Sequence, residues 1–533
     1  MINKKELRST IFKHLDGLAF APVIVSLDNK GILKSFLENK TQFLADVTKK
    51  FNANEGYLNV ALRILSSQGV LLQNINSEEI SYSLTKKGEI MLTMIPLYQD
   101  VVTFLKVSAK YDLKNFEFEP FQVWNSIFIK FKDNYGIQFS EDEEIKTIQE
   151  NILTHIEGYL VAPTIVRLGM SGMFHKYFME TSFRPEEFHR HPEKFIQILH
   201  FFTHIGWFTE KKGTFQFTDK GLFFAKRAAA YGVTVSYFPT FSKIDELVFG
   251  DASVLRNILD NEDEIHVDRE MNVWGSGGAH STYFKVIDSI IIELFNKPIN
   301  EQPKGILDMG CGNGAFLQHI FNVIDRQTLR GTMLDEHPLC LVGVDYNQTA
   351  LKVTRGNLIK ADIWAKVIWG DIGKPDLLAK DLKENYEIDL KDLLNVRTFL
   401  DHNRIWEEPK RINKDRISTS KGAFAYRGKR IANHLVEDNL LNHLKKWTPF
   451  VKKFGLLIIE LHTISSSLAA KSIGKTAVTA YDATHGFSDQ YIVEIDTLHK
   501  ISEEVGLYPD EKYFRKFPNK DYATVSINLL KEK

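Results

Sequence analysis

The sequence predicts an α/β protein with a mostly parallel sheet in its C-terminal half and a mainly helical N-terminal half. Three observations support this prediction. From about residue 255, apolar strand-like runs alternate with helical stretches, and a glycine-rich turn joins the first of these runs to a helix. The last run, 523–530, follows its predecessor too closely for parallel pairing. We therefore expect an antiparallel closing strand, and a ligand at the carboxyl ends of the parallel strands.

The composition indicates a folded protein without disulfides. A chain of 533 residues is too long to fold around one hydrophobic core, so we expect two or three domains. With 67 Lys and Arg against 68 Asp and Glu, the formal net charge is -1, which gives no cationic field for a nucleic acid. The sequence has two cysteines, no recognised membrane span and no signal peptide. These features predict a cytoplasmic protein with no nucleic-acid or membrane partner.

The N-terminal half contains two segments with the same order of predicted elements. In 1–95 and again in 156–254, helices precede two short strands and a Thr-x-Lys-Gly turn, at 85–88 and 218–221. This order predicts a divergent internal duplication of a winged-helix-like unit, with a helical connector or lid at 96–155 between the copies.

Winged helices often bind DNA, so the charges on the candidate recognition helices matter. The helix expected at 55–67 has one Arg and no Lys, and the helix expected at 192–205 has one Lys. A DNA-reading helix should carry clustered cations. We therefore interpret these units as modules for dimerisation and pocket closure.

The glycine-rich turn lies within 305–316 and has a GxGxG spacing. Glycine lets backbone N–H groups approach a ligand where any Cβ would clash. No Gly-Lys-Ser/Thr follows, so a P-loop is not indicated, and an acid stands in the strand before the turn. The pattern resembles motif I of class I S-adenosylmethionine (SAM) methyltransferases. The residues assigned to the cofactor here are Asp308, Gly310, Gly312, Asn313 and Gly314.

The next three strands end in residues suited to the rest of SAM. An acid after the second strand can accept hydrogen bonds from the ribose hydroxyls, and an acid after the third can meet the adenine amine. A neighbour of the acid after the third strand can pack on the adenine ring, and the fourth strand should face the methionine part. These residues are Asp345 and Tyr346, Asp371 and Ile372, and Asn395. The long interval before Asp345 leaves Asp335 as a rival ribose acid.

A second glycine-rich segment, 274–284, precedes motif I and is expected to be a turn that opens a helix. In one interpretation it covers the SAM carboxylate, with Gly277 and His280 nearest. In the other it is a flexible entry to the domain.

Two segments beyond the fourth and fifth strands are rich in side chains that bind metals or move protons. They contribute Asp401 and His402, and His485 and Gln490. One histidine could act as a general base in a simple O-methyltransferase. Together the segments could instead form an N/O metal site that polarises a carbonyl and stabilises an enolate. These side chains could also merely cap a helix and satisfy backbone groups.

Three of these motifs together resemble the metal-dependent C-methyltransferases of apratoxin- and saxitoxin-type polyketide loading modules. They are Gly-Ser-Gly-Gly-Ala-His at 275–280, Leu-Asn-Val-Arg-Thr-Phe-Leu-Asp-His-Asn-Arg at 394–404 and Thr-His-Gly-Phe-Ser-Asp-Gln-Tyr at 484–491. The resemblance implies a seven-stranded class I methyltransferase fold at 255–533 and a malonyl-type acceptor on a carrier protein. It also implies one iron or manganese ion, bound by His485 and Gln490 with Asp401 or His402 nearby, and we count Asp401 among the candidate ligands. We see no carrier domain in the sequence, so a carrier would act in trans.

The leading hypothesis is a SAM-dependent methyltransferase that methylates carbon beside a metal-bound carboxylate or β-dicarbonyl, in natural-product biosynthesis. We expect a small-molecule or carrier-bound acyl substrate and allow a homodimer. The alternatives are a metal-independent O-methyltransferase with His402 or His485 as base, and a SAM-sensing winged-helix regulator.

Overall fold

The computed structural model describes the whole chain apart from residues 1–2, 77–78, 257–263, 411 and 414, and apart from the side chains of 279–281. Its contacts divide the chain into two compact units. Unit 1 comprises Met1–Ser276, Ala425–Arg430 and Ser465–Ser488; unit 2 comprises Gly277–Phe424, Ile431–Ile464 and Asp489–Lys533. Neither unit is a continuous stretch of sequence. The four-part division expected above (1–95, 96–155, 156–254 and 255–533) stays a prediction about sequence domains.

Unit 1 contains two runs of elements in a similar order, in which strand β1 of the first run corresponds only to an isolated bridge, Phe183 with Phe215, in the second. The first run is α1 (Lys4–Asn29), α2 (Ile32–Glu38), β1 (Thr41–Phe43), α3 (Leu44–Phe51), α4 (Glu55–Ser67), β2 (Leu71–Asn76), β3 (Glu79–Leu84) and α5 (Lys86–Leu92). The second run is α8 (Glu143–Met170), α9 (Lys176–Glu180), α10 (Pro185–Phe188), α11 (Pro192–His204), β4 (Phe208–Lys211), β5 (Thr214–Phe217) and α12 (Asp219–Ala225). Each last helix begins at a threonine cap: Thr85 accepts from Gly88 N at 2.9 Å, and Thr218 from Gly221 N at 3.1 Å.

The remaining elements of unit 1 pack around these two runs. They are η1 (Ile95–Tyr98), α6 (Gln99–Val107), α7 (Phe118–Lys132), α13 (Ala229–Ser236), α14 (Phe238–Phe241), α15 (Ile244–Phe249), α22 (Ser466–Ala470) and α23 (Val478–Gly486). The last two come from the C-terminal half of the sequence, yet α23 packs against α1 and α4. All but one of its nine residues are buried, so it belongs to the core of unit 1.

The sequence was expected to hold no segment long and apolar enough to span a membrane, and helix α1 does not meet that expectation. By length and composition it is apolar enough to do so, but 83% of its apolar window is buried in the protein. The core helix of a protein has the same composition, because it is apolar on all sides.

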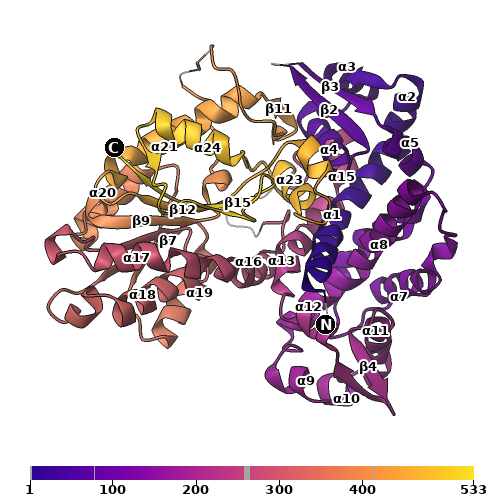
Figure 1. Ribbon diagram of the computed structural model, residues 1–533, viewed down its shortest axis with the longest axis horizontal. Helices are drawn as coiled ribbons and strands as arrows, with labels where there is room; N and C mark the ends of the chain where they lie inside the picture. Colours follow the sequence, from indigo (N-terminus) through magenta and orange to yellow (C-terminus); the bar gives the residue numbers. More distant parts are fainter. Residues whose placement is uncertain (1–2, 77–78, 257–263, 411, 414) are drawn as a thin grey trace. The chain divides into compact units, whose positions relative to one another are not determined.

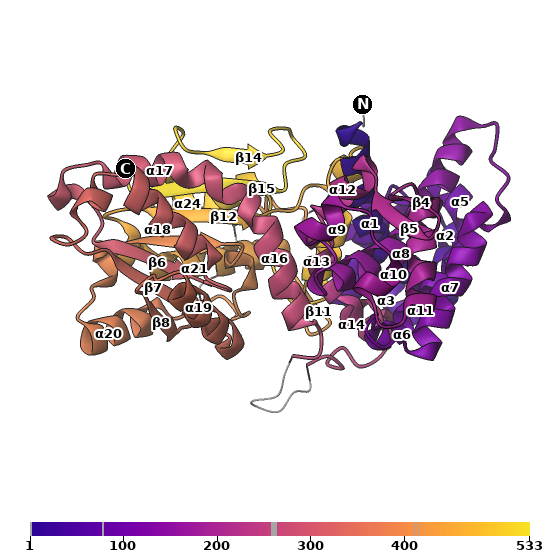
Figure 2. The ribbon, with the colours of Figure 1, turned by 90° about the horizontal axis from the view of Figure 1, so that it is seen from below.

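Unit 2 is built on a sheet with the order β13-β15-β12-β9-β6-β7-β8, in which β14 also pairs with β15 (Figures 1 and 2). The strands are β6 (Gly305–Met309), β7 (Cys340–Asp345), β8 (Lys366–Trp369), β9 (Leu393–Thr398), β12 (Leu456–Leu461), β13 (Tyr508–Pro509), β14 (Arg515–Phe517) and β15 (Val525–Lys531). Strands β8, β7, β6, β9 and β12 are parallel, and β15 is antiparallel to β12. The predicted fold and its closing strand are confirmed. The sheet has eight strands rather than seven, because β13 and β14 both pair with β15.

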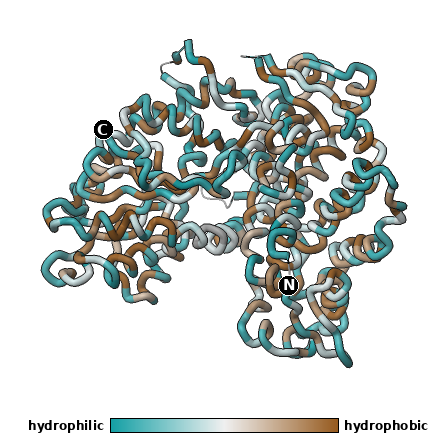
Figure 3. The backbone as a smooth tube through the Cα atoms, in the orientation of Figure 1, coloured by the Kyte–Doolittle hydropathy of each residue, from teal (hydrophilic) through white to brown (hydrophobic). Residues whose placement is uncertain are grey.

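Helices cover both faces of this sheet, as Figure 1 shows. One face packs against α17 (Asp288–Phe295), α18 (Ala315–Gln327) and α19 (Gln348–Lys360), and the other against α20 (Pro375–Tyr386) and α21 (Asn433–Val451). Strands β6 and β12 are buried on both faces, and their sequences are apolar apart from Asp308 and Glu460; Figure 3 colours the backbone by hydropathy. Asp345, Asp371 and Glu460 lie at or just beyond the carboxyl ends of β7, β8 and β12.

Candidate functional site

The GxGxG turn joins β6 to α18 in a conformation that only glycine adopts easily. Gly310, Gly312 and Gly314 have φ values of +81°, +56° and +78°. A Cβ on Gly310 would also lie 2.9 Å from the Leu400 side chain. The turn therefore brings bare backbone to the N-terminus of α18, where N–H groups and the helix dipole favour a ligand with negative charge.

An acid from the neighbouring strand closes on this turn. The Oδ2 atom of Asp345, at the end of β7, accepts a hydrogen bond from Gly312 N at 3.0 Å, and its Oδ1 accepts one from Asn347 N at 2.9 Å. The rival Asp335 is exposed in the segment before β7. The structure thus places Asp345 against motif I, and its role as the ribose acid stays a prediction.

The strand acid Asp308 is almost completely buried, with 1% of its surface exposed. Burial raises its pKa to about 8, and the charge of Asp345 adds to the rise. Its Oδ1 atom has no hydrogen-bond partner among the described residues. A buried acceptor of this kind is stabilised by a ligand that donates an N–H or O–H group.

Two aromatic rings stand at the ends of β7 and β8. Tyr346 and Trp369 have ring centroids 5.5 Å apart, and Trp369 Nε1 donates to the Tyr346 carbonyl at 3.0 Å. Beyond them Asp371 accepts from Gly373 N at 2.8 Å, and Ile372 is buried. These residues form an aromatic and acidic rim at the carboxyl end of β8.

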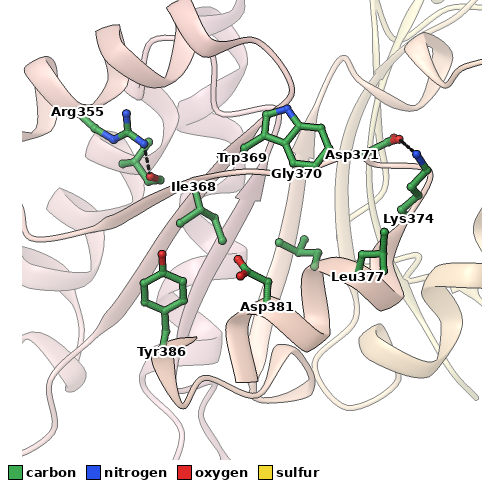
Figure 4. Close-up of a pocket in the computed structure, with 11 residues that line it drawn as sticks. Arg355, Ile368, Trp369, Gly370, Asp371, Lys374, Leu377, Asp381 and Tyr386 are labelled. Carbon is green, nitrogen blue, oxygen red and sulfur yellow. Dashed lines mark hydrogen bonds and ion pairs between the residues drawn. The ribbon is translucent and has the colours of Figure 1, made fainter. Parts of the chain in front are cut away.

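A cavity of about 490 Å³ lies along β8 and α20 (Figure 4). Its lining combines apolar side chains with Asp371 and Lys374, which form an ion pair at 3.4 Å. Apolar walls next to a carboxylate suit an aromatic ring that carries an amino group.

The second glycine-rich segment is not a turn, which corrects the expectation for 274–284. It lies inside α16 (Arg269–Phe284). A Cβ on Gly275 would meet the backbone of Gly232 on α13 at 2.7 Å, so close helix packing, and not a turn, requires glycine there. A Cβ on Gly277 would lie 2.6 Å from Asn313 Nδ2, so α16 also touches motif I. The side chain of His280 lies outside the described residues.

Asn395 is buried in β9 and is not brought to this group. Its Nδ2 atom faces the carbonyls of Leu393, at 3.3 Å, and Leu390, at 3.5 Å. Both carbonyls lie at or before the start of the strand, whereas the other predicted cofactor residues gather at strand ends. Its assignment to the cofactor stays a prediction that this orientation does not favour.

A buried charged cluster lies beyond the carboxyl ends of β9 and β12. The carboxylate of Asp401 forms ion pairs with Arg397 and with His443, whose Nε2 is 2.9 Å away. Burial alone would raise the pKa of Asp401, but the charge of Arg397 and the hydrogen bond with His443 outweigh it and lower that pKa. Burial lowers the pKa of His443, and Asp401 opposes that shift. Asp401 is therefore ionised and already neutralised by protein groups.

The neighbouring residue, His402, forms a second pair in this cluster. Its Nδ1 atom lies 2.6 Å from Glu460 Oε1, and the other carboxylate oxygen of Glu460 accepts from Asp401 N at 2.8 Å. His402 and Glu460 are 6% and 4% exposed. One glutamate at the end of β12 thus orients the imidazole and orders the turn that carries it.

Sequence reasoning missed three members of this cluster: Arg397, His443 and Glu460. The sequence did hold a signal for Glu460. Like Asp345, it is an acid near the end of an apolar, strand-like run, here 456–461. His443 lies on α21 with no local motif, so only the packing of that helix against β9 brings it to Asp401.

The other two predicted metal ligands lie in different compact units. His485 lies on α23 in unit 1, where its Nδ1 meets the Tyr481 carbonyl at 2.7 Å, and Gln490 belongs to unit 2. Within the described part of the chain, no three His, Cys, Asp or Glu side chains are grouped to hold a metal ion. Arg397 and His443 both bind Oδ1 of Asp401, and Oδ2 has no hydrogen-bond partner among the described residues. The guanidinium would repel a divalent cation, but the assignment of Asp401 as a metal ligand stays a prediction.

Models of three protein families match successive parts of the chain. The AprA N-terminal domain matches 7–73, the AprA winged helix domain matches 157–251, and the AprA MT2-like domain matches 264–528. No curated protein matches the chain.

Solved structures similar to the chain include three with low sequence identity. An O-methyltransferase family protein from Burkholderia thailandensis is 11% identical, with 70% of this chain and 95% of that chain covered and a TM-score of 0.38. The mitomycin 7-O-methyltransferase MmcR is 12% identical, with 73% and 98% covered and a TM-score of 0.39. Human N-acetylserotonin methyltransferase, in complex with SAM, is 10% identical, with 74% and 100% covered and a TM-score of 0.40.

Proposed function

We propose that this chain, a SAM-dependent methyltransferase with an AprA MT2-like domain at 264–528 behind AprA-type N-terminal and winged helix domains, methylates a carbon atom beside a carboxylate or β-dicarbonyl group. The class of enzyme that the sequence motifs indicated is thereby confirmed. The acceptor, which can be a small molecule or a malonyl-type unit on a carrier protein, is the proposed part. The single observation that supports proton removal from the acceptor is the buried His402–Glu460 pair beside the strand ends of the cofactor site, and the choice of carbon rests on the motifs that resemble C-methyltransferases.

We assign the parts of SAM to the residues at the strand ends. Asp345 would exchange its bond from Gly312 N for the ribose hydroxyls, and Asp308 would accept from the methionine amine. Tyr346 and Ile372 would hold the adenine ring, with Asp371 at its amine. We also propose that Gly277 lies near the methionine carboxylate, because α16 touches Asn313 of motif I at Gly277. His280 is proposed to lie beside it.

The proposed reaction is proton removal followed by in-line displacement. His402 takes the proton from the acceptor carbon, and Glu460 stabilises the imidazolium that results. The carbanion then attacks the methyl carbon of SAM, and the carbon–sulfur bond breaks with its electron pair going to sulfur, which leaves S-adenosylhomocysteine. Asp401, held by Arg397 and His443, acts in this scheme as a positioning group for the turn and not as a base.

The metal belongs to the proposal only in part. The charge of Arg397 opposes a metal at Asp401, so His485 and Gln490 are the main proposed ligands for iron or manganese, with Asp401 Oδ2 as a weaker one. The bond of His485 Nδ1 to the Tyr481 carbonyl places the ring proton on Nδ1 and the lone pair on Nε2, as in metal-binding histidines. A bound ion would polarise the acceptor carbonyl and so lower the pKa of the neighbouring C–H group.

A metal-independent O-methyl transfer is the second candidate, because the same His402–Glu460 pair could deprotonate a hydroxyl group. A winged-helix regulator is less consistent with the structure. Twelve of the 13 residues of α4, the first candidate recognition helix, are buried, so that helix has no face left for a DNA groove.

The test uses SAM labelled with ¹³C in its methyl group and two acceptors, a malonyl-loaded carrier protein and a hydroxyarene. The carbon chemical shift of the product separates C-methyl from O-methyl groups. Label on the malonyl carbon supports the proposal, and label only in a methoxy group contradicts it. A second assay tests whether the reaction needs a metal: the protein is treated with a chelator, and iron or manganese is then added back. Full activity in the chelated protein would remove the metal from the scheme.

A further inference from the structure

Helices α1 and α8 of unit 1 contain the same sequence pattern. Residues 14–27 read His-Leu-Asp-Gly-Leu-Ala-Phe-Ala-Pro-Val-Ile-Val-Ser-Leu, and residues 155–168 read His-Ile-Glu-Gly-Tyr-Leu-Val-Ala-Pro-Thr-Ile-Val-Arg-Leu. Seven of the 14 positions are identical, including the His, the Gly and the Ala-Pro pair. Each proline lies inside its helix. The repeat thus extends from the strands and turns of the two runs to their first, longest helices.

These two helices pack against each other through the repeated residues (Figures 1 and 2). A Cβ on Gly17 of α1 would lie 2.6 Å from His155 of α8. A Cβ on Gly158 of α8 would lie 2.9 Å from His14 of α1. Each glycine therefore receives the histidine of the other copy. Such reciprocity is the property of an isologous contact, in which residue i meets residue j and j meets i.

A second reciprocal contact joins the copies. His14 Nδ1 lies 2.9 Å from the hydroxyl of Tyr231, and His155 Nδ1 lies 2.7 Å from the hydroxyl of Tyr98. Tyr98 and Tyr231 hold equivalent positions, each 13 residues after the threonine cap of its own copy. The histidine of one copy thus pairs with the tyrosine of the other, twice. All four side chains are buried.

The two copies differ in what covers their equivalent faces. In the first copy, Ser67 on α4 bonds Thr479 of α23 at 2.8 Å, and Asp16 on α1 accepts from Ala480 N at 3.2 Å. In the second copy, α7 covers this face: Trp124 Nε1 donates to the carbonyl of Leu160 on α8 at 3.2 Å. The segment that carries His485 therefore packs mainly on α1 and α4 of the first copy, with a smaller contact to α13.

We propose that unit 1 is a dimer fused into one chain, in which α1 and α8 form the contact that two separate subunits would otherwise make. A two-fold contact is closed once both halves are present, so a second chain has no free half to pair with here. The protein therefore works as a monomer with one α23 segment and one active site per chain. This inference replaces the expected homodimer and is independent of the acceptor proposed above.

Two measurements test the proposal on the full chain. Sedimentation equilibrium over a hundredfold range of micromolar concentrations should show one species of 61.3 kDa, and a stable species of twice that mass would overturn the proposal.

The second measurement compares matched substitutions by thermal unfolding. Tyr98→Phe and Tyr231→Phe each remove one equivalent bond, and Gly17→Ala and Gly158→Ala each introduce one equivalent clash. We expect both members of a pair to lower the melting temperature by several degrees and by similar amounts. Gly356→Ala is the control, because nothing lies within 4 Å of a Cβ there, and it should cause no loss. If one member of each pair were neutral, the equivalence of the copies would be wrong. If the glycine variants fail to fold, the comparison of Tyr98→Phe with Tyr231→Phe still tests the equivalence of the two copies.

Discussion

The Nδ1 atom of His402 and the Oε1 atom of Glu460 lie 2.6 Å apart, although 58 residues separate them in the sequence. Strands β9 and β12 are neighbours in the sheet, so residues that follow one strand end meet residues at the other. The glutamate holds the imidazole by Nδ1 and also accepts from the backbone of Asp401. This pair is the basis for the first prediction.

Replacing His402 with alanine should lower kcat by about 10²- to 10⁴-fold, the usual contribution of a positioned general base. Glu460→Gln should lower kcat less, because the amide can still hold the ring but no longer stabilises its charged form. Methyl transfer at saturating SAM measures kcat, and calorimetric titration measures SAM binding. The dissociation constant of SAM should stay unchanged in both variants. A loss of SAM affinity with kcat preserved would place His402 in the cofactor site instead.

Asp345→Ala should weaken SAM binding by about tenfold or more, since a hydrogen bond to a charged group contributes about 1.5–3 kcal/mol. The matched control is Asp335→Ala, which removes the rival acid in the exposed segment before β7. Isothermal titration calorimetry of both variants decides between the two acids. Equal losses, or a loss confined to Asp335→Ala, would move the ribose away from β7.

The pKa of Asp308, raised by burial to about 8, predicts a pH dependence of stability in the protein without SAM. Between the ordinary aspartate pKa and about 8, the native state binds more protons than the unfolded state. The free energy of unfolding should therefore fall as pH rises through this window. At about 1.4 kcal/mol for each pKa unit, the fall is on the order of several kcal/mol.

Urea unfolding curves at pH 5 and pH 8 measure this fall. Asp308→Asn cannot titrate, so its stability should depend less on pH over the same window. If the variant and the parent protein showed the same pH dependence, the assignment to Asp308 would be wrong.

Arg63 and Asp482 form a buried ion pair at 2.9 Å in unit 1, with side chains 1% and 5% exposed. Asp482→Asn should destabilise the protein by about 3–5 kcal/mol, because it leaves the Arg63 charge buried without its partner. Glu144→Gln, which breaks the exposed pair with Lys86, is the matched control and should leave the melting temperature nearly unchanged. Similar effects of the two substitutions would show that Asp482 is not buried in the folded protein.

Local patterns in the sequence were sufficient for the sheet and for one side of the cofactor site. The order strand, GxGxG turn and helix is a matter of neighbouring residues, and so is an acid at the end of a strand, as at Asp345 and Asp371. The closing antiparallel strand followed from the short connection before it. The glycines of 274–284 could not be assigned in this way, because Gly275 is required by the backbone of Gly232 on another helix.

The sequence alone determined that this chain has a SAM-type turn on a mostly parallel sheet, behind two repeated helical units. Only the tertiary structure decided how Asp401 is used, because Arg397 and His443 reach it from a strand and a helix that have no shared motif. It also decided that His14 pairs with Tyr231 and His155 with Tyr98. Short-range patterns report backbone conformation, which neighbours in the chain control. The partner of a buried polar group depends instead on which elements pack together, and packing brings together residues hundreds of positions apart.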